Sequence, residues 1–139
     1  MGAYITSAEV VTRVGNAAAV RLTTDTGSTV DSALIDTFIV EVEGDINAAV
    51  SKRSDAAITQ ALYPSSYAAL KGKAMAMTVY RLAGRRPPVS EDWKAANDAA
   101  VEWLDKLVKG ERDFPDSALN GSAMEWGGND PNAAKLRDL

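Results

Sequence analysis

The 139-residue chain contains neither cysteine nor histidine. These absences exclude disulfides, thiol nucleophiles, Ser-His catalysis and nearly every zinc or haem site. No apolar run approaches the roughly 20 residues that cross a membrane, and the N-terminus lacks a signal-peptide pattern. Net charge is −4, whereas duplex-DNA binders concentrate basic residues on one face. The sequence therefore predicts a soluble, non-secreted protein that is not a dedicated DNA binder.

Asp25-Thr26-Gly27-Ser28 matches the signature around the catalytic aspartate of aspartic proteases. That function requires a β-rich fold, apolar residues before the aspartate and a second aspartate. Thr23 and Thr24 precede Asp25 instead, and both neighbouring segments have helical patterns. The stretch also lacks the alternating carboxylates of a calcium-binding EF-hand loop. We therefore predict a turn that leads into a helix cap at Asp31.

Other catalytic patterns are also missing. No serine has a lysine three residues later, and the glycines are scattered instead of forming a phosphate-binding loop. We predict that acidic pairs such as Glu41 with Glu43 lie on the solvated surface. We predict no catalytic, cofactor-binding or metal-binding residue, and we expect the protein not to be an enzyme.

Apolar residues at three- and four-residue spacings predict an all-α fold, a small bundle of about four to five helices. The predicted helices follow caps at Thr6, Asn16, Asp31, Ser65 or Ser66, and Ser90, and they end near Gly15, Leu22, Arg53, Ala83 and Lys109. Gly44 lies inside the third helix, where it predicts close approach of another helix. The fourth helix is apolar nearly all round, which is typical of a central helix or one buried in an oligomer.

The chain changes character after Phe114. Residues 115–139 are rich in Gly, Asn, Asp, Ser and Pro, so they cannot bury enough apolar area to fold alone. We predict a helical domain over residues 1–114 and an extended C-terminal arm over 115–139 that orders on assembly. Its isolated apolar residues, Trp126, Leu136 and Leu139, are candidate contacts to another protein.

Arg81, Arg85 and Arg86 form the densest positive cluster of the sequence. Their guanidinium groups could bind phosphate or acidic residues of a partner. The alternative is a helix C-terminus carrying cations that suit its dipole. We retain all three as candidate interface residues.

The order of four segments resembles the Mu-like prophage head–tail joining family of tailed bacteriophages. These segments read YITSAEVVTRVG, then VRLTTDTGSTVDSALIDTFIVEVEGDINAAV, then MTVYRLAGRRPP, and finally AVEWLDKLVKGE. Together they cover residues 4–111. The chain departs from the family pattern around residues 52–65, where it lacks a Tyr-x-Leu-Pro-Leu sequence.

The resemblance implies a small helical adaptor, or head-completion protein, at the head–tail junction of the virion, made in the host cytoplasm. Such proteins form a ring, typically of twelve copies, beneath the portal protein. The ring extends the DNA channel, encloses DNA without reading its sequence, and docks a stopper or tail-terminator protein. It needs no cofactor and no membrane. Terminal segments in the family reach the portal or a neighbouring subunit, which suits the predicted arm.

Two other functions stay open at this point. A different neck protein, a stopper or tail terminator, would be β-rich. A small helical DNA-binding packaging protein would need a helix-turn-helix and salt-sensitive binding to DNA. In the ring that the resemblance implies, by contrast, acidic residues lining the channel would let DNA slide. Such residues release no counterions from the DNA, so they add no binding affinity.

Overall fold

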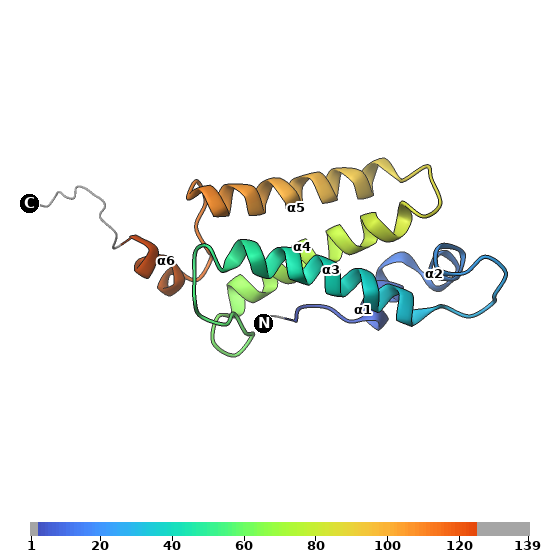
Figure 1. Cartoon of the computed structure of the whole chain (residues 1–139), viewed down its shortest axis with the longest axis horizontal. Coiled ribbons are helices and arrows are strands. Elements are labelled where there is room, and N and C mark those ends of the chain that lie inside the picture. The colour runs from blue at the N-terminus through green and yellow to red at the C-terminus, as the bar shows by residue number, and fades with distance from the viewer. Residues whose placement is uncertain (1–2, 125–139) are drawn as a thin grey trace, which may run out of the picture.

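The computed structural model describes residues 3–124, which form six α-helices (Figure 1). They are α1 (Ser7–Val14), α2 (Asn16–Thr23), α3 (Ser32–Val50), α4 (Pro64–Ala83), α5 (Glu91–Lys109) and α6 (Ser117–Met124). No strand occurs in this part of the chain. The predicted all-α class is confirmed, with one helix more than expected. None of these helices is long and apolar enough to cross a bilayer.

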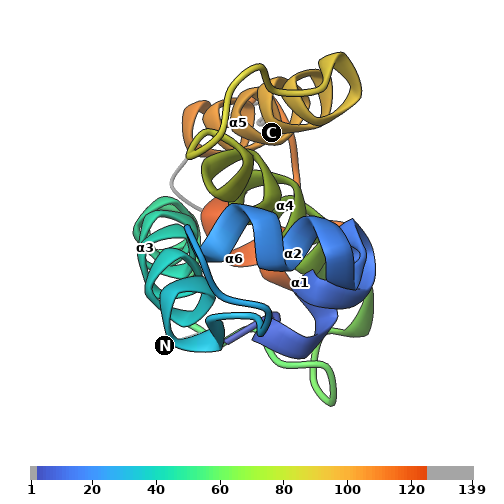
Figure 2. The same cartoon turned by 90° about the vertical axis from the view of Figure 1, so that its right-hand side faces the viewer.

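Helix α4 lies at the centre of the bundle. It contacts α1, α2, α3 and α5, and Figure 2 shows α5 above it and α3 to its left. Its apolar residues point to several sides for this reason: Leu70, Ala74 and Leu82 are fully buried, and Met77 and Val79 nearly so. The predicted central helix is confirmed.

Short-range sequence signals determine where α1 begins and where α1 and α2 meet. The Thr6 hydroxyl accepts the Glu9 amide at 3.2 Å, and the Glu9 carboxylate accepts the Thr6 amide at 2.9 Å, so the predicted capping box is present. Gly15 has φ 92°, a conformation that glycine adopts without steric cost, and it ends α1. Gly15 is also the residue before α2, so Asn16 begins that helix and does not cap it.

The Asp31 carboxylate accepts the Leu34 amide at 3.2 Å, which confirms the predicted cap of α3. The helix ends at Val50, so Arg53 lies in the turn beyond it. Gly44 is exposed, and nothing lies within 4 Å of the position that a Cβ atom would take there. The prediction that another helix of the same subunit approaches Gly44 is wrong.

The start of α4 differs from the expectation of a serine cap. Tyr63 precedes the helix, Pro64 is its first residue, and no neighbouring side chain caps it. The Ser66 amide instead donates to the Asp116 carboxylate at 2.6 Å, and the Asp116 amide donates to the Ser66 hydroxyl at 3.0 Å. A residue 50 positions away in the sequence therefore supplies the cap of the central helix.

Helix α5 follows its predicted limits. The Ser90 hydroxyl accepts the Asp92 and Trp93 amides, and Gly110 ends the helix in the left-handed conformation with φ 79°. Trp93 and Trp103 are half-buried and pack against the core.

Helix α6 was not expected, because residues 115–139 were assigned to an uncored arm. Phe114 and Leu119 are each only 3% exposed and belong to the core. The Asn120 side-chain amide also exchanges two hydrogen bonds with the Phe114 backbone, both at 2.7 Å. Residues 115–120 are thus attached to the bundle. Trp126, Leu136 and Leu139 lie outside the described residues, and the division at residue 114 stays a prediction.

Candidate assembly surfaces

Arg81 joins α4 to α3. Its guanidinium group lies 2.6 Å from the Asp45 carboxylate and 3.4 Å from that of Glu41. The Arg81 side chain is one-third exposed while both carboxylates are more than half exposed. Because water screens such pairs, their contribution is modest, up to roughly 1 kcal/mol each.

Arg85 and Arg86 serve a different purpose, at the turn that follows α4. The Arg85 side chain donates to the Leu22 carbonyl at the end of α2. Arg86 donates to the Thr24 carbonyl at 3.5 Å and forms an ion pair with Asp25. The two arginines therefore hold the segment that connects α2 with α3.

Asp25-Thr26-Gly27-Ser28 lies in that segment as an exposed turn between two helices. The Gly27 amide donates to the Thr24 hydroxyl at 3.2 Å, which closes the turn. Asp25 is 80% exposed and faces Arg86. The predicted turn is confirmed.

The three arginines consequently do not form one free cationic cluster. Each has intramolecular partners, and these partners lie on α3, at the end of α2 and in the following loop. The three residues are close in sequence, which suggested one shared role, but the end of α4 at Ala83 separates Arg81 from Arg85 and Arg86. Their role as an interface stays a prediction, limited to the exposed third of Arg81 and Arg86.

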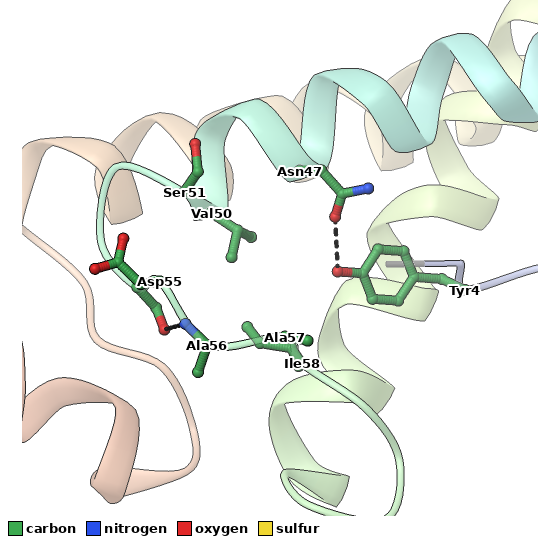
Figure 3. Close-up of a pocket in the computed structure, with 9 residues that line it drawn as sticks. Tyr4, Asn47, Val50, Ser51, Asp55, Ala56, Ala57 and Ile58 are labelled. Carbon is green, nitrogen blue, oxygen red and sulfur yellow. Dashed lines mark hydrogen bonds between the residues drawn. The ribbon is translucent and has the colours of Figure 1, made fainter. Parts of the chain in front are cut away.

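The N-terminal Tyr-Ile-Thr segment docks on the bundle through its backbone. One oxygen of the Glu43 carboxylate accepts the Tyr4 and Ile5 amides at 2.6 and 3.1 Å. The Tyr4 hydroxyl donates to the Asn47 side-chain oxygen at 3.2 Å (Figure 3). Burial, reinforced by the Glu43 charge, raises the pKa of Tyr4 to about 12. Glu43 is therefore an anchor for this segment, and not the solvated surface residue that the sequence suggested.

Lys71 of α4 completes the anchor. Its ammonium group lies 2.5 Å from the Glu9 carboxylate and donates to the Tyr4 carbonyl at 3.3 Å. The hydrogen bond from Lys71, followed by the one from the Thr6 amide, lowers the pKa of Glu9. The family-like opening is thus fixed to both α3 and α4.

A cavity of about 240 Å³ lies beside Tyr4, under the loop that follows α3 (Figure 3). Val50 and Ile58 form its apolar wall, and Asn47, Ser51 and Asp55 its polar rim. This loop belongs to the region where the chain departs from the family pattern. Nothing in the sequence indicated the cavity, because it depends on the meeting of two distant segments.

A second, wider groove of about 470 Å³ separates α3 from α5. Met77 and Leu104 form its floor, and Val101, which is 48% exposed, lies on its edge. Asp45 and Lys52 lie on the α3 side. Within residues 3–124 no group of three or more acidic side chains is arranged to hold a metal ion.

The anchored segment begins at Tyr4, and a family model described as bacteriophage Mu, Gp36 matches residues 4–129. The chain belongs to this family. No curated protein and no solved structure matches the chain. The Mu Gp36 match confirms the resemblance to Mu-like phage proteins and extends through α6, so α6 is part of the family pattern. The protein is therefore a phage structural or morphogenesis protein.

Proposed function

We propose that this Mu Gp36 family member is a head–tail connector, an adaptor that forms a ring under the portal protein. The observation that carries the proposal is the family match over residues 4–129. In this role the ring extends the DNA channel and offers a docking surface to a stopper or tail-terminator protein. The role requires no catalysis and no cofactor.

The fold supports an adaptor over the other neck proteins. Residues 3–124 contain six helices and no strand, whereas a stopper or tail terminator is expected to be β-rich. The charge of −4 supports a passive channel over a DNA-binding packaging protein. Carboxylates that face the channel would let DNA slide.

The residues after α6 are the proposed contact to the portal or a neighbouring subunit. Helix α6 lies at one end of the bundle (Figure 1), so the chain beyond it starts from a defined point. We assign Trp126, Leu136 and Leu139 to this contact, since aromatic and large aliphatic residues dominate binding energy in interfaces.

Co-purification with the portal protein of the same phage tests this role. The full chain should bind the portal and form rings on it that electron microscopy resolves. A chain truncated after Met124 should keep α6, unfold cooperatively on heating, and lose portal binding. Truncation after Phe114 is the matched comparison, because it also removes the buried Leu119 and should lower the melting temperature.

Failure of the full chain to bind the portal, or to form any ring with it, would overturn the proposal. Salt-sensitive binding to duplex DNA without portal binding would instead favour a packaging protein. The portal should be tested at two salt concentrations, so that non-specific charge attraction is recognised.

A further inference from the structure

Cations surround an indole ring on one side of α5. The Lys73 ammonium lies 5.3 Å from the centre of the Trp103 ring, and the Arg112 guanidinium 5.8 Å from it. Both distances fall within the range of cation–π attraction. Lys106 lines the same cavity, which has a volume of about 230 Å³. We call Lys73, Trp103, Lys106 and Arg112 the Trp103 patch.

The positive charge of this patch is only partly compensated. Lys106 pairs with Glu102 at 3.2 Å. Lys73 and Arg112 form no ion pair with any residue between 3 and 124. The chain as a whole is negative, with a net charge of −4. A concave positive patch on a negative protein attracts carboxylates of a partner.

The composition of the patch fits a protein partner better than a DNA backbone. Duplex DNA is held by many phosphate contacts, and this patch offers three cations with the Glu102 carboxylate among them. Tryptophan and arginine, here a half-buried Trp103 and an exposed Arg112, are typical of the residues that dominate protein–protein binding. The ligand is therefore an acidic protein surface with an apolar component.

The outer face of α3 in a second copy has this chemistry. Asp36 and Glu41 are exposed there, and Val40 is 67% exposed between them. Glu41 also lies 3.4 Å from Arg81 of its own subunit, which is one-third exposed. Asp36 forms no ion pair within residues 3–124. Charge and exposed apolar area thus complement the Trp103 patch.

The two surfaces lie on different sides of the molecule. Val101 and Asp105 of α5 border the groove toward α3, while Glu102 and Trp103 lie on the other side of α5. Figure 2 shows α5 at the top of the molecule and α3 at its lower left. One copy can therefore use both surfaces at once, which is the requirement for a head-to-tail ring.

We infer that the Trp103 patch of one subunit binds the acidic outer face of α3 in the next subunit of the ring. This inference rests on the proposed ring and adds its subunit interface. Lys73 and Arg112 pair with carboxylates of the neighbour, and Trp103 contacts the neighbour's Val40 region. The contact is heterologous, so repetition around a closed circle leaves no patch unoccupied.

Charge reversal in the full chain tests the interface. The variant Lys73→Glu/Arg112→Glu should raise the concentration needed for ring assembly at least about tenfold. Arg21→Glu/Lys94→Glu is the matched control, because it makes the same charge change at exposed positions away from the patch. The restoring variant adds Asp36→Lys to the first pair, which reverses a carboxylate of α3 and leaves the contact between Arg81 and Glu41 in place. Rings are counted by electron microscopy and native mass spectrometry, and thermal melts check that each variant is folded.

Loss of rings in the first variant, with rings kept in the control and regained in the restoring variant, supports the inference. Rings that persist in the first variant overturn it and leave the proposed function standing. Rings lost but not regained overturn α3 as the bound surface. Loss of portal or DNA binding with rings intact assigns the patch to that other partner and also overturns the inference. Absence of rings in the unmodified chain is failure of the proposed function itself.

Discussion

The two ends of the bundle are both closed by arginines, but they are built differently. At one end, which we call the Arg53 end (residues 51–63 and 110–120), the Arg53 side chain is only 10% exposed. It donates to the Leu107 carbonyl at 2.6 Å and to the Arg112 carbonyl at 3.1 Å. It thereby joins the turn after α3 to the end of α5.

The opposite end of the bundle (Figure 1) is the Asp25 end, residues 24–31 and 84–90. Its arginine contact lies closer to water. The Arg86 side chain is 33% exposed, and its partner Asp25 is 80% exposed. An arginine contact therefore contributes more to the free energy of unfolding at the Arg53 end than at the Asp25 end, because burial decides how much an ion pair or a charged hydrogen bond contributes. The arginine contacts are buried at the Arg53 end, which we call deep anchoring, and largely exposed at the Asp25 end.

The largest expected effect is that of Arg53→Leu. The substitution removes the charged donor and leaves two carbonyls without it, so the free energy of unfolding should fall by about 3 kcal/mol. Urea denaturation monitored by circular dichroism measures the change. Lys52→Leu is the adjacent control and should stay within about 0.5 kcal/mol, because Lys52 is exposed. Equal effects at the two positions would contradict deep anchoring by Arg53.

Alkaline pH should loosen the Arg53 end through Tyr4, which lines the cavity there. Its pKa is raised from 10.0 to about 12, so the folded state keeps a proton that the unfolded chain releases. Stability present below pH 10 is therefore lost as pH rises toward 12, by roughly 2 to 3 kcal/mol. Urea denaturation at pH 9 and 11.5 measures the loss, and Tyr4→Phe should reduce it. An unchanged pH dependence in Tyr4→Phe would assign the loss to other groups.

Asp116→Ala should cost about 1 to 2 kcal/mol, because it removes the remote cap of α4. Asp116→Asn keeps an acceptor oxygen and should cost less. Hydrogen exchange of the Ser66 amide localises the effect, since this amide donates to Asp116 at 2.6 Å. Protection of Ser66 that survives in Asp116→Ala would show that α4 does not depend on this bond.

The smallest effect belongs to the Asp25 end. Asp25→Asn removes the charge that faces Arg86, yet the free energy of unfolding should change by less than about 0.5 kcal/mol. Denaturation at low and high salt is the measurement, and both should give nearly the same value. A loss as large as that of Arg53→Leu would remove the contrast between the two ends.

Much of the fold could be predicted from local patterns. The Thr6–Glu9 box, the Asp31 cap and the Ser90 cap each join residues no more than three positions apart, so the sequence displays both partners together. The turn at Asp25 was predictable for the same reason. The resemblance to the phage family followed from the order of four sequence segments, which can also be read directly from the chain.

The candidate surfaces were less predictable. Arg81, Arg85 and Arg86 are neighbours in sequence, and the sequence alone suggested one shared interface. Their partners lie on other segments, because Arg81 is in α4 whereas Arg85 and Arg86 lie in the turn after it and face the end of α2 and the following loop. The Trp103 patch likewise combines α4, α5 and the loop after α5, and no spacing in the sequence indicates it.

The sequence by itself determined the five main helices, most of their caps, the exposed turn at Asp25 and the phage family. The tertiary structure decided which polar groups hold these helices together: Asp116 at the start of α4, Glu43 on the N-terminal segment and Arg53 at the end of α5. It also decided that α6 packs on the core through Leu119. The physical reason is range: a helix and its cap depend on bonds within one turn, whereas these contacts join residues about 40 to 54 positions apart.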